Sequence, residues 1–120
     1  QKQLDILNSI THPNVKKAIL ESMEEQKKSG CRLYVLEAAL LIQDGYLDIC
    51  DEMWYVYADV SKRIERLCAY RGFTDEKARK VIASQEPDSY YEENCSKKID
   101  NSGNLEKLRN QLKLAMGIEC

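Results

Sequence analysis

The chain has 120 residues, a length that fits one domain and leaves little room for two. Its 18 basic and 20 acidic residues give a net charge of -2, which argues against a general nucleic-acid binder, because such domains are usually strongly basic. Apolar residues make up 43%, which excludes a disordered composition, and no apolar run approaches the ~20 residues of a membrane span. The polar N-terminus lacks a signal-peptide pattern, so we expect a cytoplasmic protein with no membrane partner. Neither the five scattered cysteines nor the single histidine forms a metal motif, so we expect no metal site.

The first thirty residues predict two helices. Residues 3–9 have the apolar spacing of a short helix. Thr11, His12 and Pro13 then predict the start of a second one, because proline is tolerated in a first helical turn and threonine can cap it. Apolar residues continue at steps of three and four as far as Met23, and Gly30 ends the helix.

Three segments predict strands. Residues 33–36 and 53–58 are continuous apolar runs rich in strand formers, which is typical of strands buried on both faces. A shorter candidate lies at 98–100. Between the second and third candidates we predict a helix that Asp59 or Ser61 caps, a helix that begins at Thr74, and a short tyrosine-bearing helix after Pro87. A last helix begins at 103–104.

Strands separated by helices imply crossover connections and a parallel sheet, hence an α/β fold. Three strands are few for such a sheet. The domain is therefore small, or strands that complete its sheet are missing from this chain.

The basic residues are concentrated between Lys62 and Lys80, where seven cations meet three anions. An arginine surplus on an acidic protein is typical of a phosphate clamp, because guanidinium groups match phosphate oxygens. The alternative is a set of solvated helix faces paired at helical spacing, as Glu76 and Lys80 would be. Composition alone leaves both interpretations open.

Two further positions lie where parallel strands end, which is where ligands bind in such sheets. The turn at 100–103 follows the last strand candidate, although ordinary turn chemistry uses the same residues. Glu37 follows the first strand candidate, and two roles are open to it: a general base, or the cap of the next helix. The chain contains no glycine-rich phosphate loop of either common type.

Several segments together resemble dephospho-CoA kinases. The run at 7–13 (LNSITHP) is similar to that family's L-N-x-I-x-H-P element, and 37–43 (EAALLIQ) is similar to its D-x-P-L-L-x-E segment. The stretch from 57 to 85 resembles its strand, arginine-bearing helix and lid, and 99–103 (IDNSG) resembles its closing turn. The resemblance is collinear over nearly the whole chain.

The resemblance implies a P-loop-kinase-like, three-layer α/β/α fold with parallel strands and a helical lid, incomplete here because the first strand and the P-loop are absent. It divides a single partial kinase domain, 1–120, into acceptor-side helices (1–30), core strands (31–60), lid helices (61–95) and a last strand and helix (96–120). It also implies ATP with Mg²⁺ and dephospho-CoA as the ligands. The implied roles are lid arginines at Arg66 and Arg71, an ATP-side turn at Asn101, Ser102 and Gly103, and an acceptor side at His12, Glu37, Leu40 and Leu41.

The sequence also departs from the family pattern. Ala39 stands in place of proline, Gln43 in place of an acidic residue, and Tyr70 where a second lid arginine is expected. Two hypotheses follow. The chain is the carboxy-terminal part of a dephospho-CoA kinase, inactive alone, or it is a short degenerate relative that binds a CoA-like ligand or a protein. Because an incomplete sheet exposes an edge, we also predict self-association.

Overall fold

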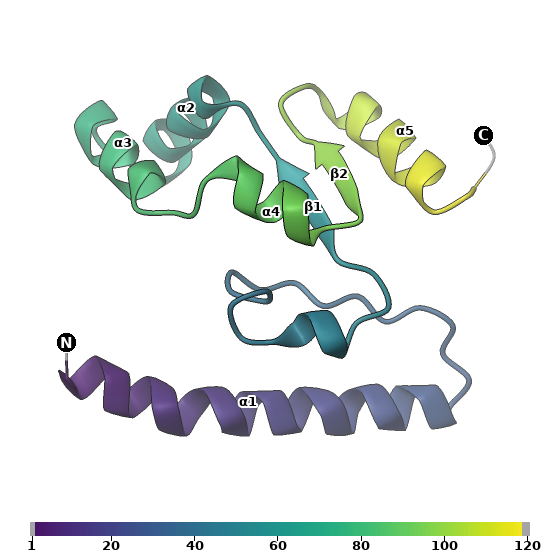
Figure 1. Ribbon diagram of the computed structural model, residues 1–120. Helices are drawn as coiled ribbons and strands as arrows, with labels where there is room; N and C mark the ends of the chain where they lie inside the picture. Colours follow the sequence, from purple (N-terminus) through teal and green to yellow (C-terminus); the bar gives the residue numbers. More distant parts are fainter. Residues whose placement is uncertain (1, 119–120) are drawn as a thin grey trace. The chain divides into compact units, whose positions relative to one another are not determined.

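The computed structural model describes the backbone of residues 2–118 and the side chains of residues 13–118 (Figure 1). Within these residues it contains five α-helices, a short 3-10 helix and two strands. The chain divides into two compact units, one that ends at Tyr46 and one that begins at Leu47. Each unit is described separately.

The first unit is dominated by one long helix, α1 (Lys2–Lys28), which includes Pro13. The prediction of two helices was therefore wrong, and His12 belongs to a helix interior rather than a helix start. A proline in a helix interior loses its N–H and crowds the carbonyl four residues earlier, but the sequences on both sides favour a helix, which continues through Pro13. The predicted end was correct: Gly30 has φ of 86°, and the Cys31 N–H donates to the Gln26 carbonyl at 3.0 Å.

The predicted strand at 33–36 does not form. Leu33 is 59% exposed and Val35 is 77% exposed, and no segment within residues 2–118 pairs with this run. A strand needs a neighbour for its backbone hydrogen bonds, and an apolar run does not by itself provide one.

The segment that follows is a set of turns attached to α1. Tyr46 is buried, and Lys16 on α1 lies over its ring at 5.1 Å from the centroid. The Lys16 ammonium also donates to the Asp44 carbonyl at 2.9 Å. One lysine therefore attaches the turn to the helix through both a hydrogen bond and a cation–π contact. The 3-10 helix η1 (Tyr46–Asp48) begins here.

The second unit contains a two-stranded parallel sheet of β1 (Trp54–Tyr57) and β2 (Lys97–Asp100). Trp54 pairs with Lys97 and Tyr57 pairs with Asp100. Beyond the strand ends, the Met53 carbonyl accepts from the Ser96 N–H at 2.9 Å and the Tyr57 carbonyl from the Asn101 N–H at 2.6 Å. The α/β class with parallel strands is confirmed, with two strands in the described residues instead of three.

Three helices connect the two strands, and a fourth follows them (Figure 1). They are α2 (Val60–Arg71), α3 (Asp75–Ala83), α4 (Asp88–Asn94) and α5 (Leu105–Ala115). Thr74 and Asn104 cap α3 and α5 by accepting from the N–H groups of Lys77 and Lys107. Gly72 ends α2 with φ of 64°. The predicted order of helices in this half is therefore confirmed.

The core of the second unit is small. Its buried apolar side chains are Met53, Ile64, Ala78 and Ile99. On β1, Val56 is 60% exposed, so the prediction that this strand is buried on both faces was wrong. The other face of β1 contacts α4, because the rings of Tyr55 and Tyr91 stack with their centroids 4.9 Å apart. Helix α5 runs beside β2.

Candidate functional site

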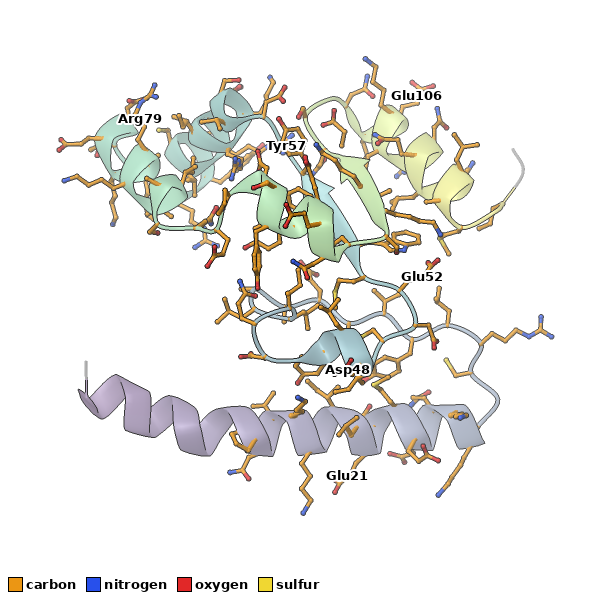
Figure 2. The ribbon with its side chains drawn as sticks, viewed as in Figure 1. Glu21, Asp48, Glu52, Tyr57, Arg79 and Glu106 are labelled. Atoms are coloured by element: carbon orange, nitrogen blue, oxygen red, sulfur yellow. The ribbon has the colours of Figure 1, made fainter. Side chains whose placement is uncertain are left out.

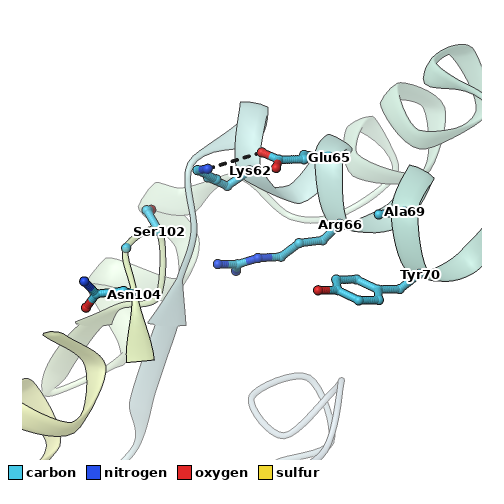
Figure 3. Close-up of a pocket in the computed structure, with 8 residues that line it drawn as sticks. Lys62, Glu65, Arg66, Ala69, Tyr70, Ser102 and Asn104 are labelled. Carbon is cyan, nitrogen blue, oxygen red and sulfur yellow. Dashed lines mark hydrogen bonds and ion pairs between the residues drawn. The ribbon is translucent and has the colours of Figure 1, made fainter. Parts of the chain in front are cut away.

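Helix α2 and the turn after β2 together form an open pocket of about 550 Å³ (Figure 3). Arg66 extends from α2 toward the turn, and Tyr70 lies beside it one helical turn later. The lining residues from α2 are Lys62, Glu65, Arg66, Ala69 and Tyr70, and those from the turn are Ser102, Gly103 and Asn104. Sequence positions more than thirty residues apart therefore meet at one site.

Arg66 and Arg63 are the half-buried cations of the basic stretch. The Arg66 guanidinium donates to the backbone carbonyl of Asn101 at 2.6 Å. Three others form exposed ion pairs at helical spacing, which confirms the predicted pairing of Glu76 with Lys80; these pairs are Lys62–Glu65, Arg79–Asp75 and Lys80–Glu76. Arg79 projects from α3 (Figure 2). These pairs take up all three anions of the stretch and contribute little energy. The charge surplus therefore rests on the four remaining cations, Arg63, Arg66, Arg71 and Lys77.

The turn at 100–104 is held by hydrogen bonds from both sides. The Asp59 N–H, just before α2, donates to the Ser102 hydroxyl at 2.8 Å. The Ser102 N–H donates to the Asp100 carboxylate at 2.8 Å. Hydrogen bonds from Ser102, first through its side chain and then through its backbone, lower the pKa of Asp100. The turn lies close to α5 at Gly103, where a Cβ would lie 3.2 Å from the Lys107 side chain.

The structure brings some of the predicted site residues together and leaves others apart. Arg66, Ser102 and Gly103 line the same pocket, and Asn101 contributes the carbonyl that Arg66 contacts. Arg71, at the end of α2, is exposed, makes no ion pair within the described residues and does not line the pocket.

The predicted acceptor-side residues belong to the first unit. Glu37 is exposed and lies in an irregular segment, not at the end of a strand as the sequence predicted, because no strand forms at 33–36. Leu40 is 46% exposed and Leu41 is partly buried in the turns that follow. His12 lies in α1, and its side chain is outside the described residues.

Sequence reasoning missed part of the lining. Lys62, Ala69 and Tyr70 lie three or four positions from Arg66 on α2, and Glu65 is its immediate neighbour. Helical spacing places residues three or four positions apart on the same face, so the pattern around Arg66 could have identified the first three. Asn104 was predicted to open α5 but not to contribute to a site.

A second polar cluster connects β1 to α4. The Tyr55 hydroxyl donates to the Asp88 carboxylate at 2.5 Å, and Arg63 on α2 approaches the same carboxylate at 3.9 Å. Burial and the hydrogen bond to Asp88 raise the pKa of Tyr55 far above its usual value. Tyr90 and Tyr91 meet edge to face at 5.4 Å between ring centroids. These tyrosines therefore pack against one another and against β1.

Within the described residues, no group of three or more histidine, cysteine, aspartate or glutamate side chains could hold a metal ion. Over the same part of the chain, no helix has both the length and the apolar character needed to cross a membrane.

Comparison with known proteins places these features in a family. Residues 1–107 match the family model for dephospho-CoA kinase. The chain is 36% identical to the dephospho-CoA kinase of Carboxydothermus hydrogenoformans over 93% of this chain and 54% of that protein. It is 34% identical to that of Latilactobacillus sakei over 100% of this chain and 59% of that protein. The chain thus spans little more than half the length of these relatives.

The fold also matches a solved structure. The crystal structure of TT1252 from Thermus thermophilus aligns with a TM-score of 0.74 and 24% sequence identity, and the match covers 97% of this chain and 59% of that chain. This likeness supports the P-loop-kinase-like α/β fold expected from the sequence.

Proposed function

Because this chain belongs to the dephospho-CoA kinase family, we propose that it forms part of an enzyme that transfers the γ-phosphoryl group of ATP to the 3′-hydroxyl of dephospho-CoA. This reaction completes coenzyme A synthesis. The observation that carries the proposal is the pocket in which Arg66 of α2 meets the turn at 100–104.

Arg66 is proposed to compensate the charge that develops on the phosphoryl group. Phosphoryl transfer depends almost entirely on positioning and electrostatic stabilisation. A guanidinium has five N–H donors and no acceptor, so Arg66 can hold the Asn101 carbonyl and still direct other donors at phosphate oxygens. Its contact with the backbone limits where the charge can lie, which reduces the reorganisation needed during the reaction.

The turn residues Asn101, Ser102 and Gly103 are proposed to lie beside the adenine of ATP. Their polar groups are fixed by partners on β1, on α2 and at Asp59 just before α2, so a ligand meets an already ordered backbone. The acceptor side is assigned to His12, Glu37, Leu40 and Leu41 in the first unit, and Arg71 is assigned to the lid.

Magnesium normally accompanies ATP in such reactions. The described residues offer no cluster of ligands for it, and we assign none of them to the metal. The 120 residues also contain no glycine-rich phosphate loop. We therefore expect this chain alone to be inactive, and we place the glycine-rich phosphate loop and metal binding elsewhere in the complete protein.

The test is a phosphoryl-transfer assay on the complete protein that carries this chain, with ATP and dephospho-CoA varied separately. We expect Arg66→Ala to lower kcat/KM for ATP by about 10²-fold, the usual effect of removing one transition-state donor. Arg66→Lys keeps the positive charge but loses the paired N–H donors of the guanidinium, so its kcat/KM should lie between those of Arg66→Ala and the unmodified protein. Lys80→Ala is the matched control, because Lys80 belongs to the same basic stretch but is exposed and paired with Glu76.

Arg71→Ala tests the second lid assignment, and a loss of activity comparable to that of Arg66→Ala would support it. A complete protein with no phosphoryl transfer to dephospho-CoA would overturn the proposed function. An active protein in which Arg66→Ala and Lys80→Ala behave alike would overturn the role of Arg66.

A further inference from the structure

We propose that Gln111, on α5, is a positioning residue that fixes the turn at 100–104 in its ATP-side geometry. This inference rests on the proposed function, because it treats that turn as part of the ATP site. The starting observation is the edge of β2 that faces away from β1. No other strand of the described residues pairs with that edge, so its backbone N–H and C=O groups need other partners.

The Asp100 backbone groups face away from β1. Tyr57 is paired with Asp100, and the Tyr57 carbonyl accepts from the next residue, Asn101. In a parallel ladder, only one residue of each opposed pair forms hydrogen bonds to the partner strand. The other residue, here Asp100, directs its N–H and C=O to the outer edge of its strand. Gln111 meets both groups: its Oε1 accepts from the Asp100 N–H at 2.8 Å, and its Nε2 donates to the Asp100 carbonyl at 2.7 Å.

One side-chain amide therefore does at this position what the peptide of a third strand would do. A glutamine amide offers both a donor and an acceptor, and its length lets α5 reach the strand edge. Gln111 also lies 3.5 Å from the Lys107 carbonyl on its own helix, a weaker contact that keeps the amide over the strand.

The consequence passes to Arg66 through two consecutive peptide groups. The first joins Asp100 to Asn101; its carbonyl is held by Gln111 and its N–H by the Tyr57 carbonyl. The second joins Asn101 to Ser102; its N–H is held by the Asp100 carboxylate and its carbonyl by Arg66. Because each planar group is held at both ends, the position of the Asn101 carbonyl that Arg66 contacts depends on the Gln111 clamp, the pair of hydrogen bonds between the Gln111 amide and the Asp100 backbone.

The test uses steady-state kinetics of the complete protein with two substitutions. Gln111→Ala removes both bonds. Gln111→Glu has nearly the same shape and keeps the acceptor for the Asp100 N–H, but it turns an oxygen toward the Asp100 carbonyl. We expect each to raise KM for ATP by about fivefold to tenfold, consistent with losing one or two neutral hydrogen bonds. KM for dephospho-CoA should stay within about twofold, because this clamp is on the ATP side.

Asn110→Ala is the matched control, since Asn110 is the exposed neighbour on α5 and its side chain makes no hydrogen bond among the described residues. A purely structural role would lower stability without separating the two substrates. Unchanged KM for ATP, or equal changes for both substrates, would overturn the inference.

Hydrogen exchange of the Asn101 and Ser102 amides gives a second readout that does not need activity. We expect Gln111→Glu to speed exchange at these two amides by at least about fivefold, while amides in α2 keep their rates. Unchanged exchange would also overturn the inference. If the wild-type protein transfers no phosphoryl group, the proposed function fails, and the exchange rates alone decide whether Gln111 holds the turn.

Discussion

Substituting Tyr55 by phenylalanine should destabilise the second unit. The change removes the hydroxyl that donates to Asp88 at 2.5 Å and leaves the ring that stacks on Tyr91. A hydrogen bond to a charged group contributes about 1.5–3 kcal/mol to stability. The Asp88 side chain is 40% exposed, so solvent replaces part of the loss, and we expect the lower end, about 1.5 kcal/mol.

The assay is urea unfolding followed by tryptophan fluorescence. Trp54 is the sole tryptophan, and it precedes Tyr55 on β1, so its emission reports on the strand under test. For a small unit whose free energy of unfolding falls by ~1 kcal/mol per molar urea, the midpoint should fall by roughly 1.5 M. A double-mutant cycle with Asp88→Ala should give a coupling of about 1 kcal/mol or more.

Tyr90→Phe is the control, because the Tyr90 hydroxyl has no hydrogen-bond partner among the described residues. The reasoning fails if Tyr55→Phe and Tyr90→Phe unfold at the same urea concentration. It also fails if the cycle with Asp88 gives no coupling, since the loss would then come from elsewhere.

Three other outcomes follow from the structure. Ile99 is 3% exposed, so Ile99→Ala should lower the free energy of unfolding by about 2–5 kcal/mol. Val56 is 60% exposed, so Val56→Ala should lower it by well under half as much in the same urea titration. Since Ser102 lowers the pKa of Asp100, the stabilising carboxylate charge is present above the usual aspartate pKa and is lost as the pH falls through the folded-state pKa. Ser102→Ala should therefore raise the pKa of Asp100, as followed by NMR titration. An unchanged pKa would contradict this assignment. Gly72 has φ of 64° with no neighbour near a Cβ, so Gly72→Ala should cost about 1–2 kcal/mol from backbone strain alone, and an unchanged melting temperature would refute that estimate.

The second unit was predictable from sequence because its signals are local. The cap at Thr74, the break at Gly72 and the opening of the last helix at Asn104 each depend on residues a few positions apart. The strand at 54–57 was also predicted, since an apolar β-forming run there finds a partner in Lys97–Asp100. The equally apolar run at 33–36 finds none in the described chain, and nothing within those four residues signals the difference.

The site was predictable only in part. Its arginine and its turn carry recognisable residue types, so Arg66, Ser102 and Gly103 could be singled out. The role of Gln111 depends on the rotation of α5 about its axis relative to the edge of β2. That rotation is fixed by tertiary packing, which a local pattern does not encode. The continuous helix through Pro13 was missed because Thr11 and Pro13 carry the local pattern of a helix start, although the helix runs through them.

The pairing of Trp54 with Lys97 joins residues 43 positions apart, with three helices between them. Such a ladder cannot form until the intervening chain has closed into a loop, and the entropy of that closure is lost before any strand hydrogen bond compensates for it. Helices α2 and α3 contact each other over a short sequence separation, so they can form early, on the timescale of local structure. We therefore expect the joining of the strands to limit the folding rate of this unit. The turn at 100–104 can take up its ordered geometry only at that last step, because it needs β1 on one side and α5 on the other.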